Sequence, residues 1–209
     1  MTAAAISVRP RLRLVRLHLV SRRVPAALAA LAACGLVLRA ALGWHWIQGG
    51  GNTPLEIPAL SEAGTAAVIA VTAHSPFGEA ERAAGRWLPW LRLGTAVALT
   101  GAAVAALAAG AAAANLDGGT LSIMRNVAGM TGIGLLSAVV LGGLLAWAGP
   151  MAYAMVSEIA LLQGWTSPWI WATRPPHDRG AALCAAACFA AGLAVVALRG
   201  ARCRMEDAL

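Results

Sequence analysis

Charged residues are scarce in this chain, and lysine is absent. Only 12% of the 209 residues are charged, against about 25% in an average soluble domain, whereas 59% are hydrophobic and the mean hydropathy is +0.70. So few charges cannot cover the surface of a water-soluble globule, which argues against a soluble enzyme. All 16 basic residues are arginine, so the chain lacks the lysine with which a P-loop holds nucleotide phosphates and cannot form a lysine Schiff base.

Groups that could carry catalysis are also few and scattered. The four histidines fall in four different segments, and no serine or carboxylate has a partner at the spacing of a catalytic motif. Cys184 and Cys188 lie one helical turn apart in an apolar run without histidine or acidic neighbours, so they fit no zinc spacing. The sequence therefore predicts a protein that is not an enzyme and holds no cofactor or metal; an intramembrane enzyme is the weakest alternative.

Long apolar runs dominate instead, and they predict an all-α, polytopic membrane protein. A helix needs about 20 apolar residues to cross the hydrocarbon core of a bilayer. Residues 127–164 contain one charged residue, Glu158, and are long enough for two spans broken at Gly149–Pro150. The second of these two spans, at about 150–163, is short enough to be re-entrant. A tryptophan-rich segment at 164–179 follows it. We predict a transmembrane domain over residues 25–199, with six spans at about 25–47, 58–74, 88–114, 127–148, 150–163 and 180–198.

The arginines predict the orientation of these spans. Residues 1–24 form a basic segment that we expect to lie on the membrane surface as an amphipathic helix; a secretory signal peptide is the alternative, but the apolar run after it is too long. Twelve arginines lie in the N-terminal segment, in 75–92 and at the C-terminus, and three lie in the opposite loops. This asymmetry predicts that both termini, including the tail at 200–209, are cytoplasmic, with contacts to anionic lipids of the cell membrane rather than to nucleic acid. The interfacial basic residues are Arg11, Arg13, Arg16, Arg22 and Arg23, together with Arg9.

A few ionisable residues lie within the predicted spans, where charge is costly and often functional. Glu158, beside Tyr153, is the deepest, and it either lines a transport path or anchors a re-entrant helix by pairing with Arg125 or Arg174. Arg39 either faces a pathway or extends toward the outer interface. Glu62 is expected at the interface.

The polar segment at 75–87 is the most informative part of the chain. Ser75 and Pro76 can start a short helix with acidic residues in its first turn, where carboxylates suit the helix dipole. Phe77 would then be an exposed apolar knob. The segment is either an ordinary cytoplasmic loop or a helix that docks a cytoplasmic partner.

The order of these features resembles the type-2 permeases of ABC transporters, particularly the small permeases of actinobacterial genomes. The resemblance extends over nearly the whole chain as an arrangement, and its most specific part is the docking segment. It implies that this segment is the coupling helix that fits a cleft in a separate cytoplasmic ATPase, which binds ATP and Mg²⁺. It also implies a second permease subunit, identical or homologous. A membrane scaffold or accessory protein that transports nothing is the alternative. The coupling-helix residues are Pro76, Phe77, Gly78, Glu79, Glu81, Arg82 and Arg86.

Overall fold

A computed structural model describes residue 19 and residues 23–43, 56–73, 88–112 and 119–199 of the chain. Every regular element within these ranges is a helix, which confirms the all-α prediction. Two short 3-10 helices, η4 and η5, accompany the longer α-helices. The elements are α2 (Val24–Gly43), α3 (Glu56–Thr72), α5 (Leu88–Ala111), α6 (Gly119–Val140), η4 (Gly143–Leu145), α7 (Ala148–Leu162), η5 (Trp171–Thr173) and α8 (Arg179–Arg199).

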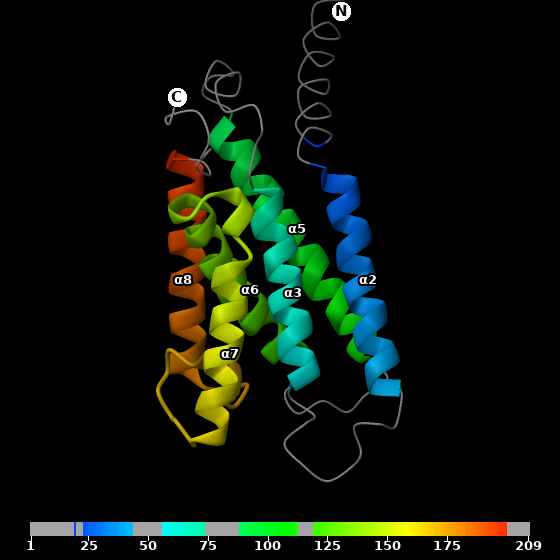
Figure 1. The fold of residues 1–209 in the computed structure, drawn as a ribbon, viewed down its shortest axis with the longest axis vertical. Coiled ribbons are helices and arrows are strands. Elements are labelled where there is room, and N and C mark those ends of the chain that lie inside the picture. The colour runs from blue at the N-terminus through cyan, green and yellow to red at the C-terminus, as the bar shows by residue number, and fades with distance from the viewer. Residues whose placement is uncertain (1–18, 20–22, 44–55, 74–87, 113–118, 200–209) are drawn as a thin grey trace, which may run out of the picture.

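The helices lie side by side in a bundle with α6 at its centre. This helix contacts α3, α5, α7 and α8, while α2 packs on α5 and α3 at the edge of the bundle. Figure 1 shows that successive helices run in opposite directions, so α2 begins at the same end of the bundle at which α8 ends. The α3 C-terminus and the α5 N-terminus lie at this end too.

Five stretches of the described chain are long and apolar enough to cross a membrane. They are α2, α5, α6, α8 and the combination of η4 with α7, Gly143–Leu162; the apolar part of α3 is shorter, at Ile57–Thr72. Large apolar side chains point outward from the bundle, and Leu183 and Leu198 of α8 are 71% and 84% exposed. An exposed surface of this kind is stable against lipid and unfavourable in water. The chain has the composition and helices of a multi-pass membrane protein.

Glycine allows a very close helix contact between α6 and α8. A Cβ atom added to Gly132 would lie 2.5 Å from the backbone carbonyl carbon of Cys188, and one added to Gly192 would lie 2.6 Å from the Gly132 oxygen. Helices in a membrane associate largely through such close packing, since lipid is as apolar as the side chains themselves. The backbones of α6 and α8 therefore touch with no space for a side chain between them.

The break between the predicted spans at 127–148 and 150–163 lies earlier than predicted. We expected the break at Gly149–Pro150, but α6 ends at Val140 and the chain turns through residues 141–147. Gly142 takes the left-handed φ of 88° that this turn requires and that glycine adopts without strain. Pro150 lies in the first turn of α7, where the backbone N–H that proline lacks would have no partner within the helix.

The start of α6 also differs from the prediction. The helix begins at Gly119 rather than near residue 127, so it includes Arg125 and Asn126. The predicted docking segment at 75–87 and tail at 200–209 lie outside the described residues. So does the predicted interfacial helix, apart from Leu19, Arg23 and Val24.

Candidate functional site

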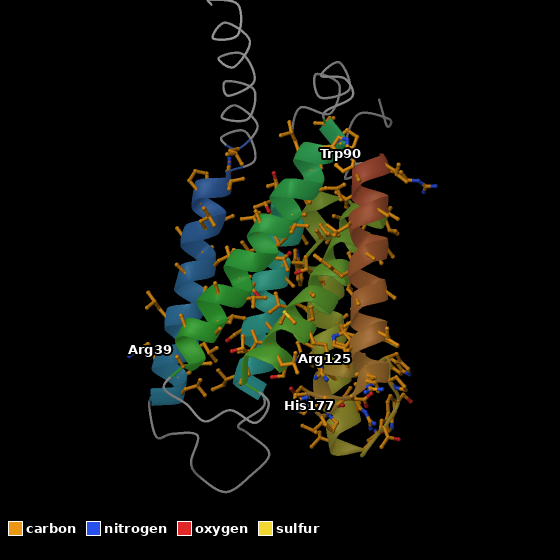
Figure 2. All side chains as sticks on the ribbon, turned by 180° about the vertical axis from the view of Figure 1, so that it is seen from behind. Arg39, Trp90, Arg125 and His177 are labelled. Carbon is orange, nitrogen blue, oxygen red and sulfur yellow. The ribbon has the colours of Figure 1, made fainter. Side chains whose placement is uncertain are left out.

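Polar side chains gather where α3, α6, α7 and the segment that precedes α8 meet. Glu62 and Arg125 are only 4% and 6% exposed, although both carry groups that are ordinarily charged. Figure 2 shows Arg125 in the half of the bundle far from Trp90, which marks the end where α5 starts. We name this group the Arg125 cluster; it consists of Glu62, Arg125, Asn126, Tyr153, Arg174 and Asp178.

An amide connects the buried carboxylate to the buried guanidinium. Asn126 donates a hydrogen bond from Nδ2 to Glu62 Oε2 at 3.0 Å and accepts one at Oδ1 from Arg125 Nε at 3.1 Å. Burying a charge is costly unless an opposite charge and hydrogen bonds compensate it. Asn126 therefore holds the two groups in a fixed geometry and joins α3 to α6.

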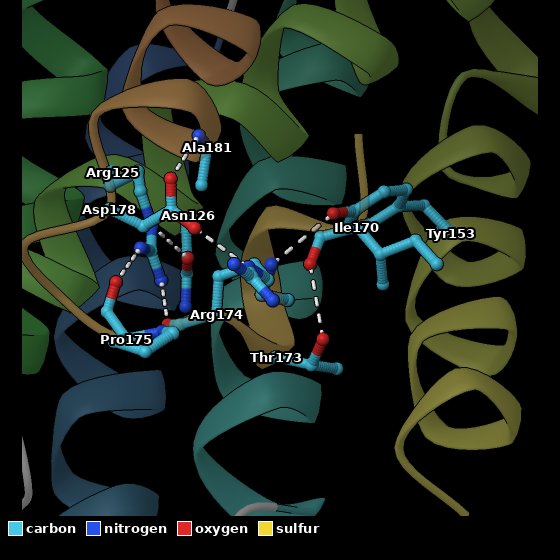
Figure 3. Close-up of polar contacts among 10 residues, drawn as sticks. Arg125, Asn126, Tyr153, Ile170, Thr173, Arg174, Pro175, Asp178 and Ala181 are labelled. Atoms are coloured by element: carbon cyan, nitrogen blue, oxygen red, sulfur yellow. Dashed lines mark hydrogen bonds and ion pairs between the residues drawn. The ribbon is translucent and has the colours of Figure 1, made fainter. Parts of the chain in front are cut away.

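The two terminal nitrogens of Arg125 bind the backbone of residues 163–178, which lie between α7 and α8 and which we call the pre-α8 segment. Nη1 donates to the carbonyl oxygen of Pro175 at 2.7 Å, and Nη2 donates to that of Arg174 at 3.0 Å (Figure 3). All three guanidinium nitrogens of Arg125 are thus engaged inside the protein. A guanidinium suits this role because its donors have a rigid planar arrangement.

Asp178 extends the same chain of contacts to α8. Its Oδ2 pairs with Arg174 Nε at 2.7 Å, and its Oδ1 accepts the backbone N–H of Ala181 at 3.1 Å (Figure 3). Asp178 is the residue before the first residue of α8, so it caps the helix N-terminus and satisfies a donor that has no partner within the helix. Polar contacts therefore run continuously from α3 through α6 to the start of α8.

Tyr153 and Trp171 fix the other part of this segment. The Tyr153 hydroxyl donates to the carbonyl oxygen of Trp169 at 3.2 Å and accepts the backbone N–H of Ala172 at 3.3 Å. Its ring stacks on Trp171, with centroids 4.5 Å apart and planes inclined by 22°. Trp171 in turn lies against Gly129 of α6, where any Cβ would meet the indole ring. The segment is thus bound by side chains of both α6 and α7.

The structure corrects one of the sequence-based assignments. Glu62 was expected at the interface, but it is buried and hydrogen-bonded, because α6 begins early enough to place Asn126 opposite it. Arg125 and Arg174, the cations expected near Glu158, contact Asn126, Asp178 and the backbone of the pre-α8 segment.

The other candidate residues are placed as follows. Glu158 lies in the second half of α7 and is partly buried. Arg39 is exposed and points away from the bundle near the end of α2 (Figure 2). Tyr153 belongs to the Arg125 cluster. Asn126 and Trp171 were missed as site residues; a polar Arg–Asn pair bordering a long apolar run was the signal that could have identified the first.

The polar groups of the Arg125 cluster bind one part of the chain to another. Its donors and acceptors join elements that are distant in the sequence, through the bonds from Asn126 to Glu62 and from Arg125 to Pro175. What this arrangement can do is to hold the pre-α8 segment against α3, α6 and α7. No family model, curated protein or solved structure matches the chain. The function is therefore inferred from its own residues.

The capping carboxylate gives the fold a testable pH dependence. The Ala181 N–H and the Arg174 guanidinium hold the pKa of Asp178 below its usual value of 3.8. A carboxyl whose pKa is lower when folded stabilises the fold above its unfolded pKa, and this stabilisation is lost as the pH falls through the folded pKa. We therefore expect thermal stability in detergent to fall on acidification below about pH 4, and Asp178→Asn to remove part of that fall.

The variant Asp178→Ser separates the capping of the helix by this residue from the titration of its carboxylate. Serine retains a capping oxygen but does not titrate, so this variant should keep more stability at neutral pH than Asp178→Ala and show the same weakened acid dependence. If all three variants match the wild type at every pH, Asp178 does not contribute to stability.

Proposed function

We propose that this chain is the membrane-spanning permease subunit of an ABC transporter. In this proposal it spans the cell membrane six times, with both termini in the cytoplasm, and pairs with a second permease subunit. A separate ATPase subunit binds ATP and Mg²⁺ and docks on residues 75–87. The substrate crosses the membrane between the spans.

The observation that carries the proposal is the position of the helix ends around the docking segment. Thr72 at the end of α3 and Leu88 at the start of α5 lie at the end of the bundle where α2 begins and α8 ends (Figure 1). The segment between them therefore joins two helices at the end of the bundle where the chain enters α2 and leaves α8, and twelve of the 16 arginines fall in the sequence before α2, in 75–92 and from the end of α8 onward. An excess of arginine marks the cytoplasmic side, where an ATPase would be available.

The contacts of α3 supply a route by which movement could pass through the bundle. The docking segment follows α3 directly, and α3 is tied at its other end to α6 by the Glu62–Asn126 hydrogen bond. Asn126 is tied to Arg125, which holds the segment before α8. A push on the docking segment when the ATPase closes would therefore tilt α3 and shift α6 and the pre-α8 segment with it. The sequence contains no lysine and therefore no P-loop, which supports the assignment of ATP hydrolysis to another chain.

The proposal is tested by disrupting the docking segment. We expect the double variant Phe77→Ala with Glu81→Arg to lose a P-loop ATPase that is encoded in the same gene neighbourhood and co-purifies with the wild-type chain. Truncating an aromatic anchor at an interface commonly costs about 2 kcal/mol or more, which is roughly a thirty-fold loss of affinity. The measurement is pull-down of the ATPase by the tagged permease from detergent-solubilised membranes.

The control is Glu206→Arg, which makes the same change of charge in the C-terminal tail and should leave the ATPase bound. Membrane insertion of all variants should equal that of the wild type. Unchanged ATPase recovery with the double variant would show that residues 75–87 are an ordinary loop, and it would favour the non-transporting scaffold.

A further inference from the structure

The turn between α6 and α7 presents an entirely apolar surface. The flanking helices carry no charged residue between Arg125 and Glu158, so no charge lies within fifteen positions of Leu141 on the N-terminal side or within ten of Trp147 on the C-terminal side. Leu144, at the tip, is 81% exposed. A water-exposed turn is ordinarily polar, and this one is not. The outward-facing side chains of the turn and of the last residue of α6 are those of Val140, Leu141, Leu144, Leu145 and Trp147.

Several backbone groups in the turn and at the adjoining ends of α6 and α7 are hydrogen-bonded to one another. Leu141 donates to the Ser137 carbonyl at 2.8 Å, and Leu145 donates to that of Gly142 at 3.2 Å. Two further bonds, from Ala146 to Gly143 and from Met151 to Trp147, continue the pattern into α7. These bonds satisfy part of the backbone of the turn, which lowers the cost of removing it from water.

The turn also lies at a different level along the bundle from the ends of α5 and α8. In Figure 1 it stops short of the ends of α5 and α8, the helices that carry Arg92 and Arg199 at this end. The stretch that is long enough to cross the hydrocarbon core of about 30 Å is Gly143–Leu162, and it already includes most of this turn. The exposed Arg199 of α8 can reach the headgroups at a level that the turn does not attain.

We propose that the α6–α7 turn is inserted among the lipid acyl chains of the leaflet on the side of the chain ends. Its apolar side chains are continuous with the exposed apolar faces of α7 and α8, where Met155 is 63% and Leu198 is 84% exposed, so lipid covers all of them as one surface. The inference concerns the lipid contact of this turn and does not depend on the transport function.

The test uses the full-length chain with its four cysteines replaced by alanine and single cysteines introduced by Leu144→Cys, Met155→Cys or Thr166→Cys. Met155 is the reference for a lipid-facing helix, and Thr166 is an exposed position outside the helices. The proteins are reconstituted into vesicles of phosphatidylcholine and phosphatidylglycerol. A charged maleimide is introduced on both sides by freeze–thaw, and a nitroxide label reports collisions with oxygen and with a water-soluble nickel complex.

We expect Leu144→Cys to behave like Met155→Cys, with maleimide labelling slower than at Thr166→Cys by roughly tenfold or more, since acyl chains exclude a charged reagent. Its nitroxide should collide with oxygen in preference to nickel. Labelling as fast as at Thr166→Cys would place the turn in water and overturn the proposal. Dipolar broadening between nitroxides at Leu144→Cys would overturn it too, because a second copy would then cover the turn.

A measurement on the wild-type chain removes any dependence on the cysteine variants. Vesicles that contain a lipid with a diazirine near the end of its acyl chain are irradiated, and the cross-linked peptides are identified by mass spectrometry. We expect adducts on residues 141–147. Adducts on α7 and α8 without any on the turn would contradict the proposal.

Discussion

Replacing Arg125 by methionine is expected to lower the free energy of unfolding by about 3 kcal/mol or more, because it leaves several buried acceptors without a donor and each such loss costs about 1–3 kcal/mol. The side chain is buried, and its three nitrogens bind Asn126 and the carbonyl oxygens of Arg174 and Pro175. Methionine has a similar length but no donor, so it leaves these acceptors and the Glu62 carboxylate without compensation. Unfolding by SDS in mixed micelles, followed by tryptophan fluorescence, measures the loss.

Arg39→Met is the matched control, because it makes the same chemical change at an arginine that points away from the bundle. Its effect should stay within about 0.5 kcal/mol, as is usual for surface substitutions. Adding Glu62→Gln to Arg125→Met should recover part of the loss, because a neutral amide needs no cation beside it. Equal stability of Arg125→Met and Arg39→Met would show that the Arg125 cluster does not hold the fold together.

The second large effect is expected from a single methyl group at Gly132. In Gly132→Ala the new Cβ would lie 2.5 Å from the backbone of Cys188, and a backbone cannot move aside as a flexible side chain can. Forcing additional atoms into a packed interface costs about 1–3 kcal/mol. We expect the α6–α8 contact to open and the midpoint of SDS unfolding to fall accordingly.

Gly101→Ala is the matched control on another helix. A Cβ at Gly101 meets nothing within 4 Å, so the substitution should gain up to about 1 kcal/mol from helix propensity. The opposite signs of the two variants are the diagnostic result. If Gly132→Ala also stabilises the protein, α6 and α8 do not approach each other as closely as described.

The helices with uninterrupted apolar runs could be located from the sequence. The predicted spans at 88–114 and 180–198 agree within a few residues with α5 and α8, because a run of about 20 apolar residues has few alternatives to a membrane-spanning helix. The start of α6 was missed by eight residues. Arg125 was treated there as a loop residue, which is reasonable for an isolated arginine but wrong for one with a buried partner.

The partner itself could not be predicted. Glu62 and Asn126 are 64 positions apart, and their hydrogen bond depends on how α3 packs against α6. Nothing local distinguishes a glutamate that meets an amide in the interior from one that reaches the headgroups. The misplaced break before α7 has a different origin, since Pro150 ends a helix in most contexts but is compatible with its first turn, and the tertiary fold selects between the two.

Arg125 recognises the segment before α8 by its main chain rather than by its side chains. Every residue type has the same carbonyl oxygen, so the residues at 174 and 175 could be exchanged over evolutionary time without loss of the two hydrogen bonds. Arg125 itself lacks that freedom, because the single ammonium group of a lysine does not offer the planar set of donors that binds two carbonyls and an amide together. Related chains would therefore retain the arginine while the sequence of the loop it holds diverges.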